Sequence, residues 1–171
     1  MRTILAAVLL LMLVLAGCKS QRPRAAQNGS TADPNVPRTN SPLPERAYKA
    51  ELRLAEPLTT MKAGEKQTIK IRVKNASDTL WLVYGIGVGV KYRVAVGDSW
   101  LDADGKLITS MDGRYGLPAN LAPNADVEVP LLITAPSQAG KYILQLDMVQ
   151  EGVTWFQDKG SPVLKVNVQV T

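Results

Sequence analysis

Apolar and polar residues alternate along several segments from Tyr48 to the end of the chain. An apolar side chain at every second position predicts a β-strand with one buried face, because successive side chains point to opposite faces of a sheet. The predicted inward positions are Leu52 and Leu54; Ile69, Ile71 and Val73; Val127, Val129, Leu131 and Ile133; Tyr142, Leu144, Leu146 and Met148; and Leu164, Val166, Val168 and Val170. Turn-forming residues interrupt this pattern about every ten positions, which predicts an all-β domain of short antiparallel strands.

Local signals add further elements. Residues 88–96 predict a third strand, and residues 100–110 predict a hairpin that turns through Asp102-Ala103-Asp104-Gly105. Pro130 indicates an edge strand or a bulge, because proline donates no backbone hydrogen bond. The glycines between positions 85 and 97 indicate a bulge or a mobile loop; they lack the spacing and the following helix of a nucleotide-binding loop. About seven strands with this turn spacing predict an immunoglobulin-like antiparallel β-sandwich over residues 47–171, with no helix.

The N-terminus has the three parts of a secretory signal. Arg2 supplies a positive charge, an apolar run follows, and small residues precede Cys18, the only cysteine in the chain. The apolar run of about 13 residues is shorter than the roughly 20 that a transmembrane helix needs. Leu15-Ala16-Gly17-Cys18 resembles the lipobox of bacterial lipoprotein precursors. An ordinary cleaved signal or a short anchor helix is the alternative.

The lipobox resemblance implies a location. Residues 1–17 are then a signal peptide, and Cys18 receives a diacylglycerol group and is acylated on its new amine after cleavage. Several acyl chains anchor a protein durably where one does not, so the membrane is a predicted partner through the lipid on Cys18. Enteric lipoproteins kept at the inner membrane have Asp after the cysteine, whereas this chain has Lys19. We therefore expect the outer membrane, facing the periplasm, in a host with two membranes.

A proline-rich segment separates the predicted lipid anchor from the domain. Residues 18–46 contain five prolines among polar residues and almost no large apolar side chains, which predicts a disordered tether. The net charge of the chain is +5, but most of this excess lies in the signal and the tether, while basic and acidic residues nearly balance in the domain. The charge therefore does not indicate a nucleic-acid partner.

The composition removes most catalytic chemistry. The chain contains no histidine, the usual general base and zinc ligand, and its one cysteine is assigned to lipid. Asp102 and Asp104 belong to a turn-like sequence rather than to an acid–base pair. We predict a protein that is not an enzyme, without cofactor or metal; an enzyme that uses only carboxylates, Ser, Thr or Lys is the open alternative.

Several stretches resemble a known kind of domain. They are residues 71–81 (IRVKNASDTLW) and 146–156 (LDMVQEGVTWF), with WLDADG, LPANLAP and TAPSQAGKY between them. In this order they are similar to small immunoglobulin-like domains of bacterial envelope proteins, including domains appended to glycosyltransferases, over residues 66–171. The resemblance implies a non-catalytic binding or spacer module. The glycine-rich residues 82–97 depart from the expected shorter link, so the shape of this end of the domain is not predicted.

Aromatic residues are the candidates for a binding surface, because their faces stack on sugars and anchor protein interfaces. Trp155, Phe156 and Trp100 are the candidates, with Glu151 as a polar neighbour and Asp147 either a polar contact or a turn residue. Trp81 closes a strand pattern and is expected in the core. We expect a membrane-anchored module that binds another envelope protein; the alternative is a carbohydrate-binding module for envelope or surface polysaccharide. The sequence predicts no oligomeric state.

Overall fold

The computed structural model describes residues 41–83 and 90–171. The predicted signal peptide, the lipid site at Cys18, most of the predicted tether and the first part of the strand predicted over 88–96 lie outside these residues. In the described ranges, no helix has the length and apolar character needed to cross a membrane.

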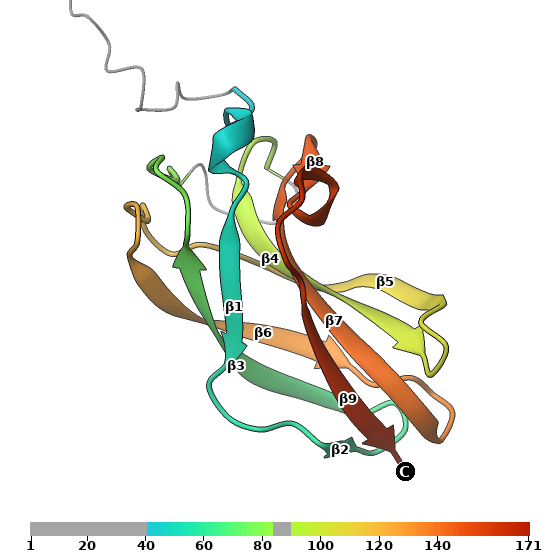
Figure 1. The fold of residues 1–171 in the computed structure, drawn as a ribbon. Helices are drawn as coiled ribbons and strands as arrows, with labels where there is room; N and C mark the ends of the chain where they lie inside the picture. Colours follow the sequence, from blue (N-terminus) through green and yellow to red (C-terminus); the bar gives the residue numbers. More distant parts are fainter. Residues whose placement is uncertain (1–40, 84–89) are drawn as a thin grey trace, which may run out of the picture. The chain divides into compact units, whose positions relative to one another are not determined.

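The regular secondary structure of the described chain consists almost entirely of strands, as the alternation predicts (Figure 1). The strands are β1 (Ala50–Leu54), β2 (Thr60–Met61), β3 (Lys66–Asn75), β4 (Val94–Asp102), β5 (Leu107–Gly116), β6 (Asp126–Thr134), β7 (Gly140–Gln150), β8 (Thr154–Trp155) and β9 (Leu164–Val170). Two single-turn 3-10 helices accompany them, η1 (Glu45–Ala47) and η2 (Gln157–Lys159).

The strands form two sheets that pack as layers (Figure 1). One sheet has the order β1-β3-β6, and the other has the order β2-β9-β7-β4-β5, with β8 paired to the end of β7. All pairs are antiparallel except β2 with β9. In immunoglobulin terms, β1, β3 and β6 correspond to strands A, B and E, and β9, β7, β4 and β5 to strands G, F, C and C′. This order confirms the predicted immunoglobulin-like β-sandwich.

Two side chains carry further marks of this fold. Tyr142, near the start of β7, donates its hydroxyl to the carbonyl of Gln138 at 3.0 Å, which is the arrangement of a tyrosine corner. Trp100 on β4 is fully buried and meets the Tyr142 ring edge-on, with 6.4 Å between ring centroids. A buried tryptophan on strand C is typical of immunoglobulin-like domains.

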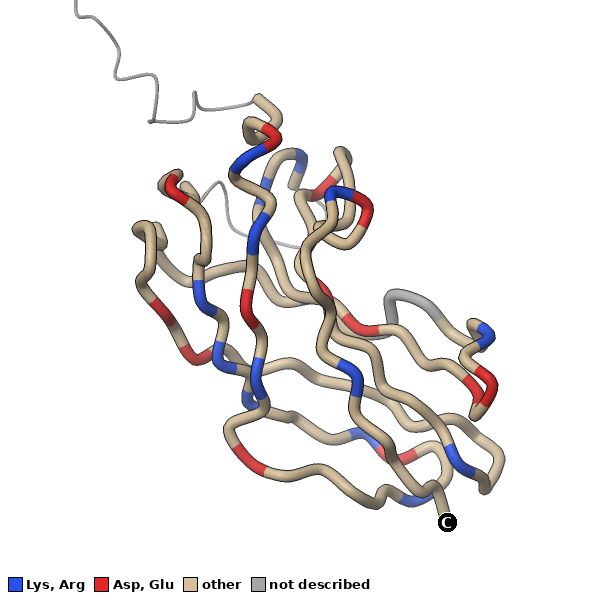
Figure 2. The backbone as a smooth tube through the Cα atoms, in the orientation of Figure 1, with Lys and Arg blue, Asp and Glu red and all other residues tan. Residues whose placement is uncertain are grey.

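Most of the predicted alternating positions lie in the core, together with residues from other segments. Buried side chains of β3, β6, β7 and β9 meet between the layers, while their polar neighbours face outward. Basic and acidic residues are interspersed over the domain (Figure 2). Lys70 pairs with Glu128 at 3.7 Å and Arg72 with Asp126 at 3.6 Å on the exposed face of the smaller sheet; such exposed pairs contribute little stability.

The predicted hairpin turn is confirmed, and its polar residues stabilise the turn. The Asp102 carboxylate accepts the N–H groups of Asp104 at 3.0 Å and Lys106 at 2.8 Å, and Gly105 has a φ of 84°. Pro130 lies on β6, an edge strand of its sheet, as expected.

Two predicted boundaries are wrong. The third strand starts at Val94 and continues to Asp102, rather than covering 88–96. The ordered packing starts before residue 47, because Leu43 is 5% exposed and its N–H donates to Gln150 Oε1 at 2.9 Å. Gln150 Oε1 also accepts the Tyr48 hydroxyl at 2.7 Å. This buried amide therefore attaches the end of the predicted tether to the domain.

Candidate functional site

Two of the predicted surface aromatics belong to the core instead. Trp100 and Phe156 are both 0% exposed. Trp100 shares the inward face of β4 with Val94 and Val96, and Phe156 meets Tyr48 and Trp81 edge-on at 5.1 and 5.3 Å. Strand β8 ends at Trp155, and the Trp155 ring packs on Gly97 at the outer face, while Phe156 turns into the core. The predictions for Trp100 and Phe156 as surface residues are wrong, whereas Trp155 and Glu151 are partly exposed.

Trp155 lies across the outer face of the six-stranded sheet. In one cross-strand row of this face, Asp147 of β7 pairs with Gly97 of β4, and Gly97 pairs with Arg114 of β5. The indole packs directly over Gly97, where a Cβ atom would lie only 3.0 Å from the indole Cη2. The missing side chain at position 97 therefore lets the ring approach β4 closely.

Arg114 joins the two predicted residues that remain at the surface. Its guanidinium carbon lies 4.6 Å from the centre of the Trp155 ring, and its Nε lies 3.5 Å from a Glu151 carboxylate oxygen. Both charged side chains are 13% exposed, so this pair is screened less than a surface ion pair. Arg114 fixes the indole against the sheet, and sequence reasoning missed it because residues 114, 151 and 155 meet only through strand pairing.

A groove of about 410 Å³ opens beside the indole. Its floor follows the outward positions of β4, and its walls come from β5, β7, β8 and the start of η2. The lining residues are Gly97, Ser99, Leu101, Leu107, Gln145, Asp147, Trp155 and Gln157. The groove thus combines one aromatic ring, two leucines, two amides, a hydroxyl and one carboxylate, which is a set suited to binding a ligand rather than to bond cleavage.

Asp147 is the electrostatically unusual group of the groove. It is 3% exposed. Burial, with a smaller contribution from the negative charge of Asp158, raises the pKa of this carboxyl from 3.8 to about 6. The backbone N–H groups of Gln157 and Met148 donate to the carboxylate and oppose the rise. The strand alternation around Leu146 and Met148 already indicates that Asp147 faces outward, but its burial on that face depends on Trp155 and η2.

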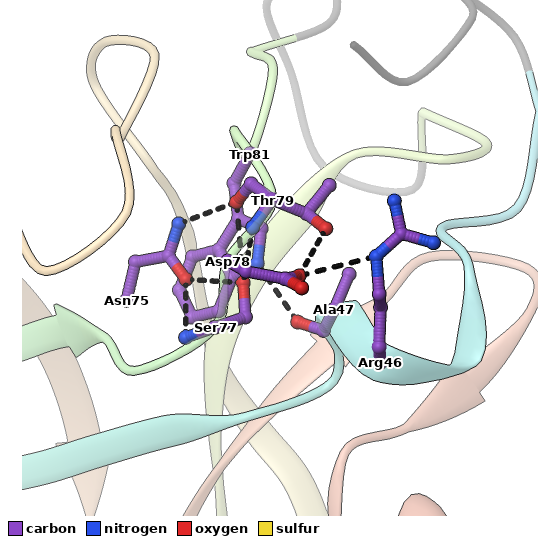
Figure 3. Close-up of polar contacts among 7 residues, drawn as sticks. All are labelled: Arg46, Ala47, Asn75, Ser77, Asp78, Thr79 and Trp81. Carbon is purple, nitrogen blue, oxygen red and sulfur yellow. Dashed lines mark hydrogen bonds and ion pairs between the residues drawn. The ribbon is translucent and has the colours of Figure 1, made fainter. Parts of the chain in front are cut away.

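The stretch after β3 that carries the family resemblance forms a structural corner (Figure 3). The fully buried Asn75 donates its amide to the carbonyls of Thr79 at 2.8 Å and Leu121 at 2.9 Å, and it accepts the N–H of Ser77 at 3.0 Å. The Trp81 indole N–H donates to the Ala47 carbonyl at 2.9 Å. Trp81 is 0% exposed, which confirms its predicted place in the core.

The groove offers a single carboxylate to a metal. In residues 41–83 and 90–171, no group of three or more His, Cys, Asp or Glu side chains is arranged to hold a metal ion.

Neither a protein-family model nor a curated protein matches the chain. Among solved structures, the CARDB domain of a Pyrococcus furiosus protein is similar at 14% identity, with a TM-score of 0.42 over 72% of this chain and 93% of that domain. A β-glucosidase from Listeria innocua is similar at 13% identity, with a TM-score of 0.39 over 71% of this chain and 16% of the enzyme. The sporulation control protein Spo0M of Bacillus subtilis gives 11% identity and a TM-score of 0.40 over 71% of this chain and 48% of that protein.

Similarity at this level carries no argument about activity or partners. The class of the protein follows from its own strand order and tyrosine corner: the described domain is an immunoglobulin-like β-sandwich with a groove on the outer face of its larger sheet.

Proposed function

We propose that the chain is a non-catalytic lipoprotein of the bacterial cell envelope whose immunoglobulin-like domain binds another envelope protein through the groove beside Trp155. The lipid anchor is Cys18, in the outer membrane and facing the periplasm where the host has two membranes. The observation that carries the binding role is the combination of the groove with the exposed apolar side chains of Leu107 and Ile108 at its β5 edge, which are 55% and 47% exposed.

This combination supports a protein partner on physical grounds. Protein interfaces have an apolar centre with polar groups placed around it. Leu107 both lines the groove and extends beyond it, so a partner that fills the groove also covers β5. The β5 strand is an edge of its sheet, and an edge strand can pair with an extended segment of another chain.

The non-catalytic part of the proposal is supported by the chemistry of the residues. The whole sequence contains no histidine, and the Asp102 carboxylate is occupied by turn N–H groups. Asp147 is the one acidic residue that lines the groove, so the groove contains no pair of carboxylates for acid–base catalysis.

Polysaccharide is a second candidate ligand, favoured by one specific observation. A partly exposed indole lies beside Ser99, Gln145 and Gln157 in the same groove, and this combination of an aromatic ring with hydrogen-bonding side chains suits a sugar. The competing ligands make different predictions about what is retained on the protein.

The test uses the full-length lipidated chain, purified in detergent and immobilised, with solubilised host envelope passed over it. The variants are Trp155→Ala and Leu107→Ala, and Leu132→Ala is the matched control, because Leu132 is 54% exposed on the other sheet. We expect one defined protein to be retained by wild type and by Leu132→Ala and to be lost from both groove variants, whose thermal unfolding is checked in parallel. Retention of polysaccharide without protein would show that the ligand is a polysaccharide and not a protein. If both groove variants retained the protein as well as wild type does, the groove would not be the binding site.

A further inference from the structure

The groove contains one charged side chain, and the structure gives that side chain no cationic partner. Asp147 is the only acidic or basic residue of the eight that line the groove. Its oxygens accept hydrogen bonds from the backbone N–H groups of Met148 at 2.7 Å and Gln157 at 3.2 Å. Among the ion pairs of the described residues, none includes Asp147.

The neighbouring charges leave this carboxylate uncompensated. Arg114, on the same face, is already paired with Glu151 at 3.5 Å and stacked on Trp155. Lys165 of β9 lies opposite Gln145 and is exposed. Asp158 of η2 adds negative charge near Asp147. A buried carboxylate in this position gains more from a bound cation than an exposed one does, because water screens the pair less.

The polarity of the rest of the groove is complementary to that of a long basic side chain. Its floor extends from Gly97 to Leu101, four residues along β4 or about 13 Å. Leu101 and Leu107 provide apolar contacts toward one end, and Asp147 lies at the other, level with Gly97. Lysine and arginine have an apolar stem and a cationic head, which match the apolar end and the acidic end of the groove.

We infer that the groove is a specificity pocket for one lysine or arginine side chain of the protein partner, whose cationic head pairs with Asp147 while its apolar stem extends along the floor toward Leu101 and Leu107. The inference rests on the proposed function and narrows it. Ser99, Gln145 and Gln157 surround the head with hydrogen-bonding groups, which a planar guanidinium or an ammonium can use. A neutral sugar would engage the same groups but would leave the charge of Asp147 unpaired.

The ionisation of Asp147 supports this assignment. With a pKa raised to about 6, the carboxyl is mostly ionised at pH 7.5 and mostly neutral at pH 4.5. A cationic ligand therefore binds at the higher pH and is released at the lower one.

The test follows the indole N–H signal of Trp155 by NMR in the full-length ¹⁵N-labelled chain in detergent micelles, with Trp155→Phe to assign the signal. The probes are Nα-acetyl-lysine amide, the uncharged Nα-acetyl-norleucine amide, which keeps the four-carbon stem and lacks the ammonium group, methyl β-glucoside, and glycerophosphoethanolamine as a lipid head group. We expect a saturable shift of the indole signal with the lysine compound at pH 7.5. The affinity should be at least about tenfold lower for the norleucine compound at pH 7.5, for the lysine compound at pH 4.5, and for the lysine compound in Asp147→Asn.

Three results would overturn the inference. They are equal affinity for the lysine and norleucine compounds, unchanged affinity in Asp147→Asn, or binding of the glucoside or the lipid head group at least as tight as that of the lysine compound. Capture of the partner protein is measured separately: capture that needs Trp155 but survives Asp147→Asn would keep the proposed function and remove the basic pocket.

Discussion

Asp147→Asn changes how the stability of the domain depends on pH. The carboxyl has a pKa of about 6 in the folded protein, against an ordinary value of 3.8, chiefly because it is buried. The folded state therefore binds a proton more tightly than the unfolded state. This preference stabilises the fold below pH 3.8 and is lost as the pH rises through 6.

The size of the effect follows from the shift. A difference of about two pKa units at about 1.4 kcal/mol per unit corresponds to about 3 kcal/mol over the whole titration. Between pH 4 and pH 7.5 the wild type should lose about 2.5 kcal/mol of unfolding free energy relative to Asp147→Asn. The substitution also alters the hydrogen bonds at position 147. This changes the stability of the variant by an amount that does not depend on pH, so the predicted change between pH 4 and pH 7.5 is unaffected.

The assay is urea-induced unfolding of both proteins at several pH values, with Asp104→Asn in the exposed turn as the control for removing one negative charge. As the pH rises from 4, the unfolding free energy of wild type should fall steadily relative to that of Asp147→Asn, and the difference between the two proteins should be constant above pH 7. A difference that stays constant across this range would mean that Asp147 titrates alike in the folded and unfolded states, and the argument from its burial would then be wrong.

Three other predictions concern the corner, the groove and the anchor. Asn75→Ala should lower the unfolding free energy by about 3 kcal/mol, because buried carbonyls lose their donors; the exposed Asn167→Ala is the control, and equal melting temperatures would contradict the assignment. Gly97→Ala should displace the Trp155 ring and weaken partner capture, since the new Cβ would lie 3.0 Å from the indole; an unchanged Trp155 indole NMR signal would refute this. Cys18→Ser should abolish metabolic labelling with a fatty acid and release the protein from membranes, and labelling equal to wild type would exclude Cys18 as the anchor.

Period-two alternation was sufficient to predict the strands that build the core. Residues such as Ile71 on β3 and Val129 on β6 are buried, with charged or proline neighbours outside, because each sheet buries one face only. The fold class follows from this pattern and the turn spacing. The start of β4 could not be predicted, because alternating glycine and valine upstream of it satisfy the strand pattern as well as the true strand does.

The candidate site was only partly predictable. The pair Trp155-Phe156 indicates that one ring faces the core and one faces out, but the choice depends on the Tyr48 and Trp81 rings that receive Phe156. On β4, Asp98 faces inward beside Trp100 and is 1% exposed. A charged residue two positions before Trp100 interrupts the alternation of apolar and polar residues, so the pattern did not indicate that Trp100 faces the core.

The partnership of Arg114 with Glu151 and Trp155 carries no sequence signal at all. It arises because β5 and β8 lie on opposite sides of β4 and β7 in one sheet, and both reach across its outer face.

The most direct measurement of the central claim is site-specific photocrosslinking in living cells, with benzoylphenylalanine placed at Ser99 in the groove of the full-length chain and, as control, at the exposed Gln67 on the other sheet. We expect one defined protein adduct from position 99 that is absent from position 67 and is lost when Trp155→Ala is added. Adducts shared by both positions, or an adduct at position 99 that persists without Trp155, would contradict a binding site on this face.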